Sequence, residues 1–139
     1  KDSKLCNILF GKELSNRLYE NNLSIPVICW APGLVISRDS QGFFRYSREY
    51  NQLGQILFAY LARDILRITV SNKEAGILLN NLVCSSKYNE GGFNYYSNKI
   101  VSPGKFIFEK TNISDEAKEE GLSAKLWDLS KSLIDKKLR

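Results

Sequence analysis

A largely apolar run at residues 25–31, Ile-Pro-Val-Ile-Cys-Trp-Ala, predicts a β-strand. Its apolar residues do not alternate with polar ones, so such a strand needs cover on both faces, as strands of a parallel sheet have. Pro32-Gly33 follows at once and marks a turn. Open parallel sheets bind ligands beyond the carboxyl ends of their strands, so this turn is a candidate binding element. A buried strand followed by an ordinary turn would give the same pattern.

Helical spacing of apolar residues recurs in four other stretches. Residues 3–18 predict a helix that ends at Asn21-Asn22, and residues 53–68 repeat leucine and isoleucine at steps of four and three. Ser71 and Glu74 stand at the N-cap and N3 positions of a capping box, which begins the next helix. The last helix starts with acidic residues at 115–120 and is broken at Gly121. We expect it to bury a leucine stripe, made of Leu122, Leu126, Leu129 and Leu133.

A second strand is predicted at residues 92–97, after Gly91-Gly92, and a loop with Pro103-Gly104 and a short apolar run at 106–108 follow it. A short step from helix to strand is typical of α/β proteins, and we predict that fold class. A parallel strand at 25–31 needs neighbours on both edges, and 92–97 is the plausible neighbour. We therefore expect the other edge to be open or filled by material outside this chain.

Composition fits one soluble globular unit, since 139 residues with 43% hydrophobic and 25% charged residues suit a single domain. No run reaches the roughly 18 apolar residues of a membrane span, and the first residues lack signal-peptide features. We therefore expect a cytoplasmic protein. The sequence has no Met, even at position 1, which suggests a fragment.

The residue types present restrict the chemistry. Cys6, Cys29 and Cys84 are odd in number, widely spaced and set among apolar residues, so we expect buried thiols rather than disulfides. The absence of His and of a CxxC pair argues against a zinc site, and it removes nucleophiles that depend on His. Acid–base chemistry would have to use Lys, Tyr, Asp, Glu or Cys.

A formal net charge of +5 permits an anionic partner, such as a phosphate-bearing cofactor, a membrane surface or nucleic acid. Four aromatic residues crowd together between arginines, namely Phe43, Phe44, Tyr46 and Tyr50. They would suit a lid over an apolar ligand, a membrane-surface patch or a base-stacking surface, or they fill the fold's own core. Nucleic acid is the weakest of these partners, because the basic residues form no stripe.

Three segments resemble the light-dependent protochlorophyllide reductases, which are short-chain dehydrogenases/reductases. Residues 1–7, Lys-Asp-Ser-Lys-Leu-Cys-Asn, resemble the segment after that family's catalytic tyrosine, where the motif reads Tyr-Lys-Asp-Ser-Lys. Glu74-Ala75-Gly76 and residues 125–130, Lys-Leu-Trp-Asp-Leu-Ser, resemble later landmarks. The resemblance covers nearly the whole chain and is thin at residues 38–70.

The resemblance implies the C-terminal half of a doubly wound, Rossmann-like parallel sheet, with about two strands and flanking helices. Residues 1–139 would form one unit, with a substrate loop or lid inserted at 38–70. The implied activity is hydride transfer from NADPH to a large apolar substrate of the tetrapyrrole type, in chlorophyll biosynthesis. The implied partners are that small-molecule substrate, the N-terminal half of the same protein and the surface of a photosynthetic membrane.

The resemblance also assigns site residues. Lys4 would bind the nicotinamide ribose and lower the pKa of the catalytic tyrosine, which would directly precede Lys1; a solvated first-turn lysine is the alternative. The glycine-rich turn for the cofactor's pyrophosphate is not in this chain. The cofactor-binding set after the strand is Pro32, Gly33, Leu34, Val35 and Ser37, with the Val35 backbone and the Ser37 hydroxyl at the carboxamide. The substrate-binding set is Phe43, Phe44, Tyr46 and Tyr50.

Two positions depart from the photoactive pattern. Ala31 and Leu34 stand where photoactive members carry Tyr before the Pro-Gly pair and Cys after it. This difference argues for a reductase without the photochemistry. The rival interpretation is a non-catalytic module that binds a pigment or a membrane surface through its aromatic and arginine-rich segment.

Overall fold

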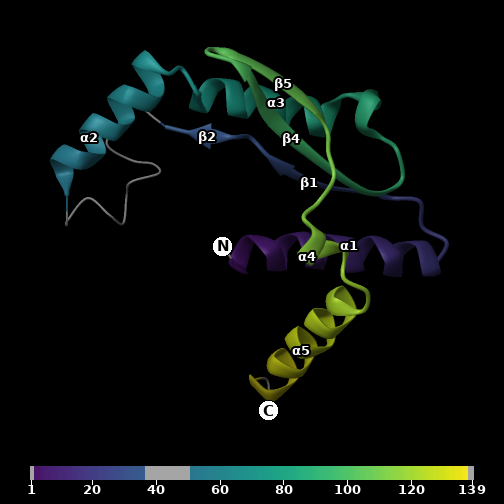
Figure 1. Ribbon diagram of the computed structural model, residues 1–139. Helices are drawn as coiled ribbons and strands as arrows, with labels where there is room; N and C mark the ends of the chain where they lie inside the picture. Colours follow the sequence, from purple (N-terminus) through teal and green to yellow (C-terminus); the bar gives the residue numbers. More distant parts are fainter. Residues whose placement is uncertain (1, 37–50, 138–139) are drawn as a thin grey trace. The chain divides into compact units, whose positions relative to one another are not determined.

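The computed structural model describes residues 2–36 and 51–137 (Figure 1). The chain is of the α/β class, as the sequence predicted, and its described part holds five strands rather than about two. The elements are α1 (Asp2–Glu20), β1 (Pro26–Ala31), β2 (Leu34–Val35), α2 (Gln52–Tyr60), the π-helix η1 (Leu61–Ile65), β3 (Thr69–Val70), α3 (Asn72–Cys84), the 3-10 helix η2 (Ser86–Tyr88), β4 (Gly92–Ser102), β5 (Lys105–Lys110), α4 (Asp115–Lys118) and α5 (Leu122–Lys137).

The chain divides into two compact units, which are described separately below. Unit 1 comprises residues 1–30, 87–96 and 110–139, and unit 2 comprises residues 31–86 and 97–109. The expected single unit with an insertion at residues 38–70 stays a prediction, since residues 37–50 lie outside the described part.

The first helix of unit 1 matches the prediction closely. α1 ends where Asn22 adopts a left-handed φ of 58°, and the Leu23 amide donates to the Leu18 carbonyl over 2.9 Å. Gly11 is buried where α1 meets β1 and β4, because a Cβ there would lie 2.8 Å from Cys29 Sγ and 3.2 Å from the Phe93 ring. Only glycine permits this close approach.

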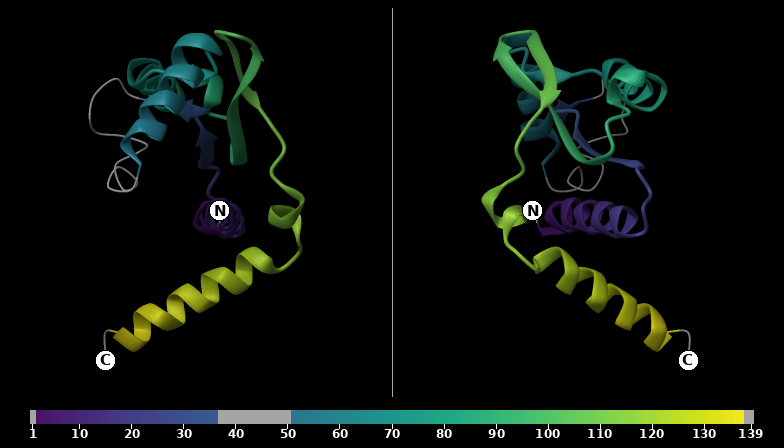
Figure 2. Two further views of the ribbon diagram at one scale, coloured as in Figure 1. Left: turned by 60° about the vertical axis from the view of Figure 1, so that its left-hand side comes forward. Right: turned by 90° about the vertical axis from the view of Figure 1, so that its right-hand side faces the viewer.

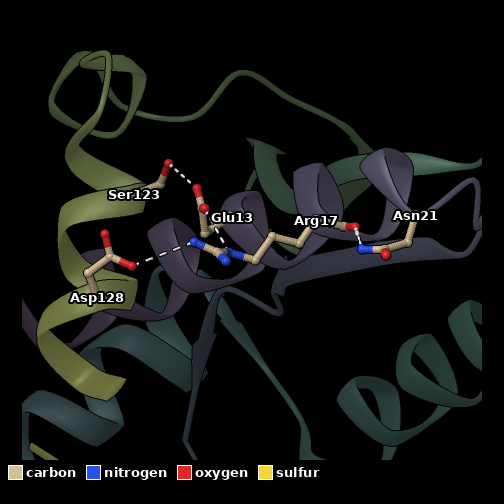
Figure 3. Close-up of polar contacts among 5 residues, drawn as sticks. All are labelled: Glu13, Arg17, Asn21, Ser123 and Asp128. Atoms are coloured by element: carbon tan, nitrogen blue, oxygen red, sulfur yellow. Dashed lines mark hydrogen bonds and ion pairs between the residues drawn. The ribbon is translucent and has the colours of Figure 1, made fainter. Parts of the chain in front are cut away.

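A buried carboxylate joins α1 to α5 within unit 1. Glu13 is 7% exposed, and its carboxylate accepts hydrogen bonds from Arg17 Nε at 2.9 Å and from Ser123 Oγ at 3.0 Å (Figure 3). The Arg17 guanidinium also lies 3.7 Å from Asp128 of α5. Both partners of Glu13 are donors, so the buried charge is compensated.

Aromatic packing reinforces the same helix pair. The Phe10 and Trp127 rings stack with centroids 5.1 Å apart, and the Arg17 guanidinium lies 4.8 Å from the Trp127 ring centroid. α5 therefore packs on α1 through its first two turns.

The expected leucine stripe of α5 is wrong at its later positions. Leu129 and Leu133 are each 57% exposed, and Ile134 is 59% exposed. The reason is geometric, since the later turns of α5 run away from α1 in all views (Figures 1 and 2). Gly121, with φ of +73°, separates α4 from α5, as predicted.

The three-stranded sheet has the order β1-β4-β5. β1 therefore has β4 as its neighbour, as expected, and its other edge carries no strand in the described part of the chain. All six residues of β1 are half-buried, so its apolar run is not covered on both faces by these residues. Pro103-Gly104 links β4 to β5 as a hairpin, with Gly104 at φ of +74°.

Unit 2 has a small core around a parallel strand pair. β2 pairs with β3 in parallel, with Leu34 opposite Thr69 and Val35 opposite Val70. Val70 and the neighbouring Ile36 are 2% and 4% exposed. The capping box of α3 is confirmed, because the Ser71 side chain accepts from the Glu74 amide and the Glu74 carboxylate accepts from the Ser71 amide.

The helix expected over residues 53–68 changes type along its length. α2 gives way to η1, in which the Leu66 amide donates to the Leu61 carbonyl at 2.8 Å. Its apolar spacing does not mark a buried face, since Leu53 is 82% exposed and Leu57 is 59% exposed. The residues that the structure describes leave this stripe uncovered.

Candidate functional site

The turn after β1 has a fixed backbone in unit 2. Gly33 adopts φ of +91°, a left-handed conformation that favours glycine. Asn98 Nδ2 of β4 donates to the Pro32 carbonyl over 3.3 Å, and β2 then joins the ladder with β3. The structure thus brings Pro32, Gly33, Leu34 and Val35 into one turn whose glycine is exposed to solvent.

Asn98 is the residue of this turn that sequence reasoning missed. It lies beyond the stretch 92–97 predicted as a strand, and its partner is 66 positions away in the chain. The signal that could have found Asn98 was a polar side chain in a strand that extends beyond residue 97.

Lys4 lies exposed on the first turn of α1, in unit 1. Its ammonium makes no hydrogen bond or ion pair with any residue that the structure describes. A hollow of about 380 Å³ adjoins it, lined by Lys4, Leu5, Ile8, Ser114, Asp115 and Glu116. The Asp115 carboxylate accepts from Lys118 Nζ at 2.7 Å, a bond that lowers the pKa of Asp115. Lys4 therefore keeps an unpaired charge beside a partly apolar hollow.

The cysteines differ from the expectation. All three are free, but Cys6 and Cys84 are exposed, so the expected burial is wrong for them. Both lie on helices whose surrounding surface is uncovered in the described residues. Cys29 is half-buried against Gly11, and burial raises its thiol pKa. A raised pKa disfavours the thiolate, so we assign Cys29 a role in packing rather than the role of a nucleophile.

Several predicted site residues lie outside the described part, namely Ser37, Phe43, Phe44, Tyr46 and Tyr50. Their roles stay predictions, as do those of Lys4 and the turn. Lys4 belongs to unit 1 and the turn to unit 2, and each is described by itself. Among residues 2–36 and 51–137, no three His, Cys, Asp or Glu side chains gather as a metal site, and no helix is long and apolar enough to cross a membrane.

Comparison with known proteins finds similar sequences among the protochlorophyllide reductases. Protochlorophyllide reductase A of Oryza sativa is 31% identical over 134 residues, which are 96% of this chain and 32% of that protein. The chain is similar to the protochlorophyllide reductases along nearly its whole length. Protochlorophyllide reductase B of Hordeum vulgare and the Cucumis sativus enzyme match at 30% and 31% identity over 96% of the chain. No known family profile matches.

The match covers about a third of the relatives' length, and it lies in their C-terminal half. This confirms the resemblance drawn from residues 1–7, 74–76 and 125–130. The names of these three relatives describe them as chloroplastic.

Proposed function

We propose that this chain is part of an NADPH-dependent oxidoreductase of the short-chain dehydrogenase/reductase type, acting on a large apolar substrate related to protochlorophyllide. The observation that carries the proposal is the similarity to protochlorophyllide reductases along 96% of the chain. The residues present also support it, because Lys4 and the Pro32-Gly33 turn occupy the positions to which the resemblance assigns cofactor binding.

The described residues fit such a cofactor. A nicotinamide nucleotide needs a turn whose backbone is accessible, and the solvent-exposed, left-handed Gly33 suits that need. A ribose hydroxyl needs a polar side chain with a free donor, and the unpaired Lys4 ammonium is one. When bound, NADPH would supply the hydride.

The chain's own residues would position the groups and hold a proton. The Lys4 ammonium would bind the ribose and, by its charge, lower the pKa of a neighbouring tyrosine phenol. Val35 and Ser37 would orient the carboxamide, and Phe43, Phe44, Tyr46 and Tyr50 would face the apolar substrate. Ala31 and Leu34, both half-buried beside the turn, offer no side chain that transfers a proton. We therefore propose a reductase that works without the photochemical step.

By analogy with its relatives, we place the protein in a chloroplast, as a peripheral protein at a photosynthetic membrane. In the natural protein, the residues described here would combine with an N-terminal half that carries the tyrosine and the phosphate-binding turn. This chain alone would then bind NADPH weakly and would be inactive.

The test compares Lys4→Met with Lys131→Met in the natural protein that carries this chain. Both lysines are exposed and lack a partner among the described residues, so loss of charge is the shared change. Lys12 is a poor control, because its Nζ donates to the Ala117 carbonyl at 3.2 Å. We expect Lys4→Met to weaken NADPH binding, followed by cofactor fluorescence, and to slow turnover roughly 100-fold or more.

Turnover is measured with protochlorophyllide as substrate, in the dark and under light. Equal cofactor binding and equal turnover in the two variants would refute the role of Lys4. If the wild type also binds no NADPH and reduces no pigment under either condition, the oxidoreductase proposal fails and a pigment- or membrane-binding module replaces it.

A further inference from the structure

A second hollow lies within unit 2, at the start of α3, and none of the site residues assigned above lines it. Its volume is about 420 Å³. Three cations line it, Arg63, Arg67 and Lys73, together with one carboxylate, Glu74, and the polar residues Thr69, Ser71 and Asn72. We call it the basic hollow. Ile36 and Phe106 give it an apolar wall.

The carboxylates nearest to these cations are already engaged. Asp64 accepts hydrogen bonds from two nitrogens of Arg63, from Nη2 at 2.7 Å and from Nε at 3.1 Å to each carboxylate oxygen. Glu74 accepts from the Ser71 amide at 2.9 Å and from its hydroxyl at 2.8 Å. Both bonds lower the pKa of Glu74, and the bond from the Ser71 amide has the larger effect. They hold the Glu74 carboxylate in the capping box.

Arg67 and Lys73 therefore keep free charges. Neither side chain has a hydrogen bond or an ion pair with any residue in the described ranges. A guanidinium with five N–H donors and an ammonium with three thus line one concave surface without an acceptor of their own. Such a pair suits an anion with several oxygens, and phosphate binds arginine through two parallel hydrogen bonds.

The backbone of Arg67 supports a role for its side chain. It has φ of +50°, in the left-handed region, at the residue that follows η1 and Leu66. The chain is held there by bonds on both sides, from the Ile68 amide to the Ala62 carbonyl at 2.9 Å and from the Gly104 amide to the Arg67 carbonyl at 2.8 Å. Glycine is the usual residue at such helix ends. An arginine there costs folding free energy, and the hydrogen bonds that hold the turn are made by its backbone and not by its guanidinium.

We propose that the basic hollow binds a phosphate group, held by Arg67 and Lys73 with Arg63 beside them. The hollow is larger than a bare phosphate ion and has an apolar wall, so the ligand is an organic phosphate. A free phosphate ester and the headgroup of a phospholipid offer the same chemistry. The inference is independent of the proposed reductase activity, because it uses no residue of that site.

The decisive variant is Arg67→Gly in the natural protein, because glycine suits the left-handed backbone while the guanidinium is lost. Binding of inorganic phosphate and of glycerol 3-phosphate is measured by calorimetry at constant ionic strength, set with chloride. Binding to vesicles of phosphatidylglycerol in phosphatidylcholine is measured by co-sedimentation, with pure phosphatidylcholine vesicles for comparison. We expect Arg67→Gly to weaken the binding that the wild type shows by roughly tenfold or more, and Lys73→Gln to weaken it similarly.

Lys131→Gln is the matched control, because it removes an exposed charge from α5 of unit 1 and should leave affinity unchanged. Arg67→Lys should restore part of the affinity. If Arg67→Gly loses affinity only for the free phosphates, the ligand is a soluble phosphate ester. If it loses affinity only for the phosphatidylglycerol vesicles, the ligand is a lipid headgroup. The proposal is overturned if Arg67→Gly binds every probe as tightly as the wild type, or if the wild type binds none of them. NADPH affinity, which reports on the other site, should not change in Arg67→Gly.

Discussion

Charged groups are used in opposite ways in the two units. In unit 1 the buried Glu13 carboxylate has both of its partners in place, and Arg17 is shared between Glu13, Asp128 and the Trp127 ring. In unit 2 the cations of the basic hollow outnumber the carboxylates free to pair with them. Compensated charges hold helices together, whereas an uncompensated cation in a hollow is available to a ligand. Whether a charged side chain has a partner thus distinguishes structural residues from candidate binding residues, and no related sequence is needed to do so.

The largest expected effect is at the contact that brings α1 against the sheet. Gly11→Val would place carbon atoms against Cys29 Sγ and the Phe93 ring, and we expect a loss of about 3 kcal/mol in the free energy of unfolding. Gly76→Ala on α3 is the control, since nothing lies within 4 Å of its added Cβ. That change should stabilise the protein by about 0.5–1 kcal/mol. Chemical denaturation measures both, and equal effects would contradict the close approach.

Removing the buried carboxylate should cost somewhat less. Glu13→Ala leaves the buried Ser123 hydroxyl without its acceptor, and we expect a loss of about 2 kcal/mol. The solvent-exposed pair Lys99 and Glu109, 2.7 Å apart, provides the comparison, and Lys99→Ala should cost less than about 0.5 kcal/mol. Similar losses in the two variants would mean that the α1–α5 network contributes no more than a surface ion pair.

Arg67→Gly should act in the opposite direction on stability. Relief of the left-handed strain should raise the free energy of unfolding by up to about 1 kcal/mol. Asn22→Gly is the matched change at φ of 58°, and it should be near neutral because asparagine tolerates that conformation. A clear destabilisation of Arg67→Gly would indicate that the guanidinium holds the fold, and the contrast between the two units would weaken.

The smallest expected effect is on pH dependence. The folded state lowers the pKa of Glu74, so its capping bonds add stability at pH values above the unfolded pKa. That contribution is lost as the pH falls through the folded pKa. The carboxylate is exposed, so screening keeps the effect to a few tenths of a kcal/mol. Thermal melts of the wild type and Glu74→Gln should differ at neutral pH and converge in acid; a constant difference would argue against the titration of Glu74.

Local signals predicted the local structure well. The capping box at Ser71, the break at Gly121 and the end of α1 at Asn22 each depend on a few neighbouring residues, and each is confirmed. The turn at Pro32-Gly33 was likewise evident from its dipeptide.

Exposure was predicted poorly, because it depends on what covers a helix rather than on its periodicity. The spacing of Leu129 and Leu133 indicated a buried face, yet α5 contacts α1 through Ser123 and Trp127 and leaves these leucines exposed. The bond from Asn98 to Pro32 and the free charge on Arg67 are likewise tertiary features, since each depends on residues distant in sequence. The basic hollow therefore has no sequence motif.

The π-helix that precedes Arg67 has an evolutionary consequence. A π-turn closes its hydrogen bond over one more residue than an α-helical turn does, and π-bulges are frequent at functional sites. Deleting one residue within Leu61–Ile65 would restore α-helical spacing and rotate the helical residues that follow the deletion by roughly 100° about the helix axis. The turn that carries Arg67 would then begin at a different point around the helix axis, although no cation had been lost. On the proposal made above, a change of one codon within residues 61–65 would be enough to weaken the binding of phosphate, and a change in length there among related sequences would record that event.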